Sequence, residues 1–147
     1  MSSGIFNAMN VSASGMTAQR TRMDIISQNI ANVNTTRDEN GDVYRRQTVV
    51  FQENSNAPFD RVLSNHLETY KAKGVKISAI VEDTREGAMA YDPSHPDADE
   101  NGYVQLPNVN TVTEMTNLID ASRSYEANAT AFNAAKSMAM KGLELFQ

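Results

Sequence analysis

Apolar side chains recur every seven residues at both ends of the chain, and this repeat limits the fold more than any other feature of the sequence. In the N-terminal part the repeat falls on Met9, Met16, Met23 and Ile30. A seven-residue repeat is typical of a helix that packs one stripe of side chains against another helix. We therefore predict a helix from Ile5 to Asn32.

The C-terminal end carries a second, more dilute repeat. Its successive stripe positions are Met115/Leu118, Ser122/Tyr125, Ala129/Phe132, Lys136/Ala139 and Leu143/Phe146. Asn110 or Thr111 can cap the start of this helix, and Glu114 follows Thr111 by three residues, as in a capping box. Because small and polar residues dilute both stripes, neither helix should be stable alone. Each should pack against the other or against a helix of another subunit.

Proline and charge divide the chain into three parts. All four prolines lie between Pro58 and Pro107, and residues 37–107 hold twenty-one charged residues, against three in residues 1–36 and seven in residues 108–147. We therefore predict an N-terminal helix in 1–36, a β-rich and extended middle segment in 37–107, and a C-terminal helix in 108–147. The predicted fold class is α+β, with the terminal helices packed as a coiled-coil-like pair.

β-Branched and aromatic residues mark the strands expected in the middle segment. Residues 43–52 and 74–81 are the two main candidates, and residues 103–106 are a short third one. Asn40-Gly41, just before the first candidate, is a typical hairpin turn. Residues 52–73 are rich in asparagine and charge, and we expect a loop or disorder there.

Composition excludes several classes of function. The formal net charge is −5, whereas nucleic-acid binders usually carry a basic face. The chain has no cysteine, which excludes disulfides, thiolate catalysis and cysteine-ligated zinc. No apolar run approaches the roughly 18 residues of a membrane span, so we expect no direct membrane insertion. The first ten residues lack the basic and apolar regions of a secretory signal peptide.

One acidic loop partly matches a calcium site. The first half of an EF-hand loop is present as Asp97, Asp99, Asn101 and Gly102. The twelfth position is Asn108, where a bidentate glutamate is needed. The alternative function is therefore a small Ca²⁺-binding or helical-hairpin interaction module that uses residues 97–108.

The same loop contains His95, which with Asp92 could be offered as the acid–base pair of a hydrolase. The sequence supplies neither a nucleophile nor an oxyanion donor for such an enzyme. Without a metal or a reaction, residues 91–103 are expected to form an extended connector, because Pro93 and Pro96 restrict the backbone. Asn101-Gly102 should then make a tight turn.

Three stretches of the chain resemble bacterial flagellar rod and hook proteins. The first is residues 14–36, most specifically the run Asn29-Ile-Ala-Asn-Val-Asn-Thr35. The second runs from Tyr91-Asp-Pro-Ser-His-Pro96 to Pro107-Asn-Val-Asn110, and the third contains Glu114-Met115 and Ala121-Ser-Arg-Ser-Tyr-Glu-Ala-Asn128. Within this axial protein family the chain is most similar to subunits of the proximal rod.

The resemblance implies a structural role. Its members are exported through the flagellar type III export apparatus without a cleaved signal peptide. They polymerise helically in the periplasm, where the rod transmits motor torque and encloses the export channel. The terminal helices form the inner tube and the middle segment lies outside it. Implied partners are further copies of the chain, the other proximal rod subunits, the distal rod protein and the adaptor between rod and membrane ring.

We predict subunit-interface residues and no catalytic, cofactor-binding or metal-binding residues. The predicted interface comprises Met9, Met16, Met23, Ile26, Asn29, Ile30, Asn32, Asn34, Met115, Leu118, Ile119, Tyr125 and Phe132. The three asparagines among them should cap the helix end and hydrogen-bond a neighbour. Residues 92–102 are expected either to pack against an adjacent subunit or to form a solvated loop.

Overall fold

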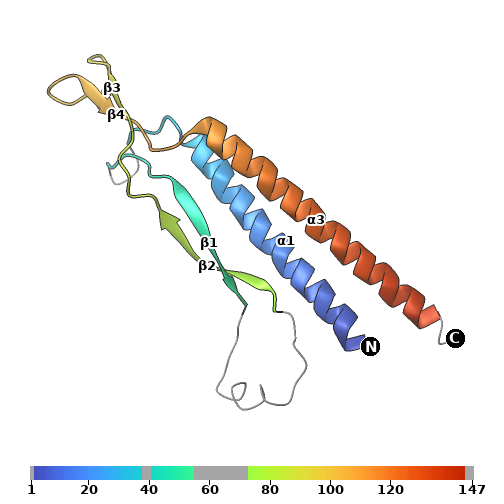
Figure 1. Cartoon of the computed structure of the whole chain (residues 1–147). Coiled ribbons are helices and arrows are strands. Elements are labelled where there is room, and N and C mark those ends of the chain that lie inside the picture. Colours follow the sequence, from blue (N-terminus) through green and yellow to red (C-terminus); the bar gives the residue numbers. More distant parts are fainter. Residues whose placement is uncertain (1, 38–40, 55–72, 145–147) are drawn as a thin grey trace, which may run out of the picture. The chain divides into compact units, whose positions relative to one another are not determined.

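The structure, a computed structural model, describes residues 2–37, 41–54 and 73–144. Its elements in chain order are helix α1 (Ser2–Ala31), strands β1 (Gln47–Glu53), β2 (Val75–Glu82), β3 (Met89–Tyr91) and β4 (Tyr103–Gln105), and helix α3 (Thr111–Glu144) (Figure 1). The predicted α+β class, with long terminal helices packed together, is confirmed. Residues 55–72, most of the segment expected to be a loop or disordered, lie outside the described residues.

Contacts divide the chain into two compact units, and each unit takes a part of both helices. Unit 1 comprises Met1–Arg20, Phe51–Ser78 and Arg123–Gln147, and unit 2 comprises Thr21–Val50 and Ala79–Ser122. Unit 1 therefore holds the first part of α1 and the last part of α3. Unit 2 holds the end of α1 and the start of α3.

Helix α1 ends at the asparagine-rich turn that the sequence predicts. The side-chain amide of Asn32 donates to the carbonyl of Gln28 at 2.9 Å, and its own carbonyl oxygen Oδ1 accepts from the Thr35 hydroxyl at 3.1 Å. The Gln28 carbonyl also accepts from the backbone N–H of Asn32 at 3.1 Å, so the Asn32 side chain adds a second bond to a carbonyl that already has an intrahelical partner. The Asn32 side chain therefore bonds at the helix end, and its predicted hydrogen bond to a neighbouring subunit stays a prediction.

Asn110, one of the two predicted caps, precedes helix α3 and caps it. Its Oδ1 accepts from the backbone N–H of Thr113 at 3.0 Å, and its backbone carbonyl accepts from the N–H of Glu114 at 2.9 Å. The predicted capping box between Thr111 and Glu114 is wrong. The Glu114 carboxylate is fully buried and bonds to residues distant in sequence instead.

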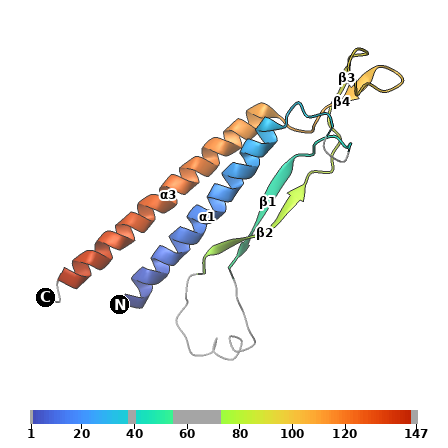
Figure 2. The same ribbon diagram turned by 180° about the vertical axis from the view of Figure 1, so that it is seen from behind.

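Several of the buried side chains on the two helices are small. In unit 1, Gly15, Ala18 and Ala135 are buried, and a Cβ added to Gly15 would lie 2.9 Å from Cγ of Asn128. In unit 2, Ile25, Ile26 and Ala121 are buried. The view from behind lets both helices be followed over their length (Figure 2). In the described part of the chain, neither helix combines the length and apolar character that crossing a membrane requires.

Strands β1 and β2 form a two-stranded sheet. The strand predicted over 74–81 is confirmed as β2, whereas the one predicted over 43–52 begins only at Gln47. The hairpin turn predicted at Asn40-Gly41 includes Asn40, which lies outside the described residues; β1 pairs with β2. Before β1, the backbone N–H of Tyr44 donates to the carbonyl of Thr35, just after α1, at 3.3 Å.

Strands β3 and β4 form a second, antiparallel pair, in which Ala90 lies opposite Val104. The predicted strand over 103–106 is confirmed as β4, but β3 is not predicted by the sequence. Residues 92–102 therefore form the loop of a hairpin, not an extended connector. Its turn at Asn101-Gly102 is confirmed, since Gly102 has a φ of +80° and its N–H donates to the Asp99 carbonyl at 3.0 Å.

Candidate functional site

Asn29 is the centre of a buried polar cluster in unit 2. Its side chain is completely buried. The amide nitrogen donates to the Gln47 carbonyl at 2.8 Å and to Oε2 of Glu114 at 3.0 Å. The amide oxygen accepts from the Tyr44 hydroxyl and from the Gln47 N–H, both at 2.9 Å. An asparagine amide has two donors and two acceptor positions, so all four are occupied within the chain.

Glu114 carries the charge of this cluster, and its side chain is 0% exposed. One carboxylate oxygen accepts from Asn29, and the other accepts from Nε of Arg46 at 2.8 Å and lies 2.8 Å from its Nη2. A buried carboxylate needs such a partner, because an unpaired charge in the interior is strongly destabilising. The cluster thus joins the end of α1, the start of β1 and the start of α3.

Tyr44, in the chain segment before β1, belongs to the cluster through its hydroxyl group, which donates to Asn29. Burial raises the pKa of the Tyr44 phenol, and the negative charges of Glu114 and Glu82 raise it further. The phenol therefore remains protonated over the physiological pH range and can donate to Asn29. The Glu114 carboxylate, the Tyr44 phenol and the Asn29 amide form a structural hydrogen-bond network. None of these three groups is placed to act as an activated nucleophile.

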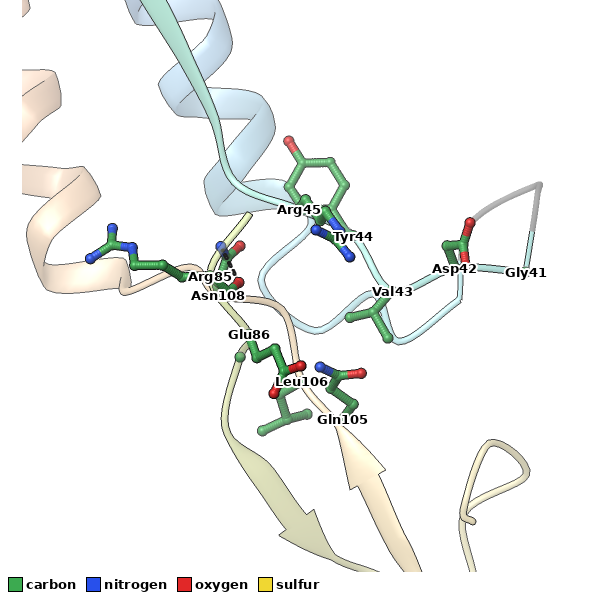
Figure 3. Close-up of a pocket in the computed structure, with 11 residues that line it drawn as sticks. Gly41, Asp42, Val43, Tyr44, Arg45, Arg85, Glu86, Gln105, Leu106 and Asn108 are labelled. Carbon is green, nitrogen blue, oxygen red and sulfur yellow. Dashed lines mark hydrogen bonds between the residues drawn. The ribbon is translucent and has the colours of Figure 1, made fainter. Parts of the chain in front are cut away.

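Asn108 makes a second junction in unit 2, at the edge of a cavity of about 270 Å³. Its amide nitrogen donates to the carbonyls of Asp83 and Arg85, both at 2.9 Å, and its oxygen accepts from the Arg46 N–H at 2.7 Å. Figure 3 shows Asn108 beside Arg85, with Glu86, Gln105 and Leu106 on neighbouring segments of the cavity wall. The hydrogen bonds of Asn108 therefore join two segments beside the cavity, the one around Arg46 and the one from Asp83 to Arg85.

The hairpin loop does not support the calcium alternative. The carboxylate of Asp97 lies 3.1 Å from the Arg37 guanidinium and accepts from the Thr36 hydroxyl at 2.8 Å. Oδ1 of Asp99 accepts from the backbone N–H groups of Asn101 and Tyr103, both at 2.8 Å. These carboxylates hold the loop together, and no group of three or more acidic or histidine side chains in the described residues is arranged to bind a metal.

The hydrolase alternative gains no support from the position of His95. Nδ1 of His95 accepts from the Asp97 N–H at 3.1 Å, and Asp92 accepts from the hydroxyl of Ser94 at 2.6 Å and from its N–H at 3.1 Å. The Ser94 bonds lower the pKa of Asp92. Both side chains therefore stabilise turns within the loop.

The thirteen residues predicted at a subunit interface differ widely in exposure. The exposed ones are Asn34, Met115 and Ile119. The half-buried ones are Met9, Met16, Met23, Ile30, Asn32, Leu118, Tyr125 and Phe132. The buried ones are Ile26 and Asn29. Asn29 uses its whole hydrogen-bonding capacity inside its own chain, so its role is intrachain.

Sequence reasoning missed Tyr44, Arg46 and Asn108 as members of a site. It assigned Glu114 to a local cap, because Thr111 precedes it by three residues. Arg46 and Glu114 are 68 positions apart, and no local spacing links them. Two signals were available, because Glu114 and Asn108 both lie within stretches that resemble flagellar axial proteins.

Comparison with known proteins agrees with this resemblance. A family model described as flagella basal body rod protein matches residues 9–37, and one described as flagellar basal body rod FlgEFG protein C-terminal matches residues 100–145. The two matched ranges contain Asn29 and Glu114. They therefore include both helices that meet at the buried cluster.

Proteins similar over nearly the full length carry one name, flagellar basal-body rod protein FlgC. The Bacillus subtilis protein is 47% identical, over 95% of this chain and 97% of its own. The Borreliella burgdorferi protein is 44% identical, over 98% and 99%. The Salmonella typhimurium protein is 36% identical, over 97% and 98%. On this evidence of sequence, helices and matched motifs, the chain belongs to the FlgC family of flagellar basal-body rod proteins.

Proposed function

We propose that the chain is a structural subunit of the flagellar proximal rod, which polymerises helically into the drive shaft that crosses the periplasm. In this role it transmits motor torque and helps to enclose the export channel. Membership of the FlgC family supports the role, and the observation that carries it is an exposed apolar face on α3.

That face lies in unit 2 and is formed by Val112, Met115 and Ile119, which are 75%, 55% and 53% exposed. At about 100° per residue, these three side chains fall within an arc of about 60° around the helix. The buried residues Glu114 and Ala121 lie on the opposite side of α3. Helix α3 therefore offers one face to its own chain and a separate apolar face to a neighbour.

We propose that Met115 and Ile119 form the centre of the subunit contact. The half-buried stripe residues supply the rest, because partly exposed apolar side chains can gain burial when a second helix packs beside them. The other apolar residues that we propose at subunit contacts are Met9, Met16, Met23, Ile30, Leu118, Tyr125 and Phe132. A face that contacts a different face of the next copy does not close on itself, and such contacts generate helical filaments.

The proposed partners are further copies of the chain, the other proximal rod subunits, the distal rod protein and the adaptor that joins the rod to the membrane ring. The flagellar type III export apparatus would deliver the chain without cleaving a signal peptide. A structural role requires no reaction, and we propose that the chain has no enzymatic activity. The polar clusters described above support this, because their groups bond to one another.

The test is to replace Ile119 by aspartate in cells that carry the gene only on a plasmid. Electron microscopy should show membrane rings without rod, hook or filament, and the cells should not swim. The purified Ile119→Asp protein should keep the helix content of the unmodified chain, since Ile119 is exposed. Normal flagella in this strain would overturn the assignment of the α3 face.

Ile119→Leu is the matched control, because it keeps an apolar side chain of the same size at the same position. These cells should assemble rods and swim. If cells that lack the gene altogether also build normal flagella, the rod function itself is contradicted. The two failures are therefore distinguishable.

A further inference from the structure

Two contacts between α1 and α3, one in each unit, have the same heptad spacing. In unit 2, Asn29 donates to Glu114 at 3.0 Å. In unit 1, a Cβ on Gly15 would lie 2.6 Å from Oδ1 of Asn128. Residues 15 and 29 are two heptads apart on α1, and residues 114 and 128 are two heptads apart on α3. The heptad offset between α1 and α3 is therefore the same in each unit.

The apolar stripe does not select this alignment by itself. Small side chains recur on the same face of α3 at Ala121 and Ala135, one heptad on either side of Asn128, and both are buried. A slip of one heptad would bring Gly15 opposite one of these alanines. The close approach of the two helices at Gly15 would then be preserved, so small-residue packing cannot distinguish the alternatives.

The buried polar cluster does distinguish them. A slip of one heptad would carry Glu114 away from Asn29, level with Arg22 or with Thr36 beyond the end of α1. Asn29 would lose an acceptor in a position that is completely buried, and Arg46 would lose the carboxylate that it contacts at 2.8 Å. Buried polar groups without partners are costly, and one buried polar residue in a heptad seam can specify the register.

We infer that the Asn29–Glu114 pair sets the register between α1 and α3. The hydrophobic stripe brings the helices together, and the pair selects one alignment out of several that small residues permit. The pair also fixes the start of β1 to this alignment, since Asn29 bonds to both the N–H and the carbonyl of Gln47. This role of the pair lies within a single chain and does not depend on the proposed function.

The chain has no cysteine, so an introduced cysteine pair reports one alignment without background. Gly15→Cys/Asn128→Cys reports the observed register. Two further proteins report a slip of one heptad, one for each direction. Both carry Gly15→Cys and Asn128→Ala; one adds Ala121→Cys and the other adds Ala135→Cys. Asn128→Ala keeps residue 128 small in both slip reporters. Each purified full-length protein is oxidised at low concentration with copper-phenanthroline, and crosslinked peptides are identified by mass spectrometry.

In the otherwise unmodified chain, the reporter of the observed register should crosslink at least about tenfold faster than either slip reporter. In the Asn29→Leu/Glu114→Leu background, which removes both partners of the pair, we expect this ratio to fall to about threefold or less. An unchanged ratio would overturn the inference. Circular dichroism of each protein verifies that the helices persist.

Asn29→Asp is the second background, because it is isosteric and places two carboxylates together without changing the packing volume. It should also reduce the crosslinking ratio, and an unchanged ratio would contradict the inference. If both backgrounds lose their helices, the pair is required for folding as such, and its role as a selector between alignments is overturned.

Discussion

Nη2 of Arg46 lies 2.8 Å from Oε1 of Glu114, and the two partners of this ion pair differ sharply in their access to water. The Glu114 side chain is 0% exposed, whereas the Arg46 side chain is 21% exposed. Removing one partner leaves the other without its opposite charge. Because an uncompensated charge costs more in the interior than at the surface, the two single substitutions should have unequal effects.

We predict that Arg46→Met destabilises the fold more than Glu114→Gln does. The first leaves a buried carboxylate without its cation and should lower the free energy of unfolding by about 3–5 kcal/mol. The second keeps a polar group beside Asn29 and leaves an arginine that can reach water, so its cost should be about 1–2 kcal/mol. Urea unfolding followed by circular dichroism measures both values.

Arg45→Met is the control for the loss of a cation in the same segment. Arg45 is exposed, and its replacement should change the free energy of unfolding by less than about 0.5 kcal/mol. Equal losses for Arg46→Met and Glu114→Gln would contradict the argument from unequal burial.

Gly87 should not tolerate a side chain. A Cβ at this position would overlap the carbonyl oxygen of Leu106, next to the place where the Leu106 N–H donates to the Ala88 carbonyl at 2.9 Å. The obstacle is backbone, which cannot rotate away as a side chain can. Gly87→Ala should therefore lower the free energy of unfolding by about 1–3 kcal/mol, measured by urea unfolding.

Gly142 provides the contrasting case. It lies inside α3, and a Cβ there would meet nothing within 4 Å. Gly142→Ala should stabilise the helix by about 0.5–1 kcal/mol, because alanine restricts the unfolded chain more than glycine does. If the two glycine substitutions had effects of the same sign, steric overlap at Gly87 would not be the cause.

Asp83 should titrate well below an ordinary aspartate. Hydrogen bonds from the Arg85 guanidinium, 2.9 Å and 3.0 Å from Nε to the two oxygens, hold the pKa of Asp83 at about 2, against 3.8 for the model compound. Since the folded carboxylate binds a proton more weakly than the unfolded one, its stabilising effect is complete above pH of about 4 and is lost as the pH falls through about 2.

Carbon-detected NMR of the Asp83 carboxyl measures this pKa directly. Arg85→Ala should raise it toward 3.8 but not fully, because the backbone N–H of residue 85 also donates to Oδ1 at 3.1 Å. An unchanged midpoint in Arg85→Ala would show that the guanidinium is not the main cause of the low pKa.

Asn110 should contribute to stability through its cap alone. Its side chain bonds to the Thr113 N–H at 3.0 Å, and the residue itself is exposed. Asn110→Ala should cost about 1 kcal/mol in thermal or urea unfolding, and Asn110→Ser should recover most of this loss, because serine can accept the same bond. Equal losses in alanine and serine variants would argue against the cap.

The helices could be predicted from the sequence because their signals are local and long. The predicted range Ile5–Asn32 differs by a few residues at most from the observed Ser2–Ala31, and Asn110 was one of two predicted caps. Strand β3 could not be predicted, since the three residues Met89–Tyr91 are too few for an alternating pattern. Only pairing with β4 makes this segment a strand.

The partners of β1 and Glu114 illustrate a second limit. A turn signal at Asn40-Gly41 favoured a local hairpin, but β1 pairs with β2 across a long connection. Likewise the spacing from Thr111 favoured a local cap for Glu114, whereas its partners are Asn29 and Arg46. Both β1 and Glu114 could bond to a partner near in sequence or to a distant one. The distant contacts, which decide between these partners, form only when the whole chain is folded.

The exposed methionines of α3 can serve as built-in probes for oxidative footprinting. Met115, Met138 and Met140 are each more than half exposed, whereas Met9, Met16 and Met23 are half-buried. Dilute peroxide converts accessible methionine to the sulfoxide, a mass increase that peptide mapping assigns to single residues. Comparing the free chain with isolated basal bodies would therefore map which side of α3 becomes shielded on assembly, with no label added to the protein.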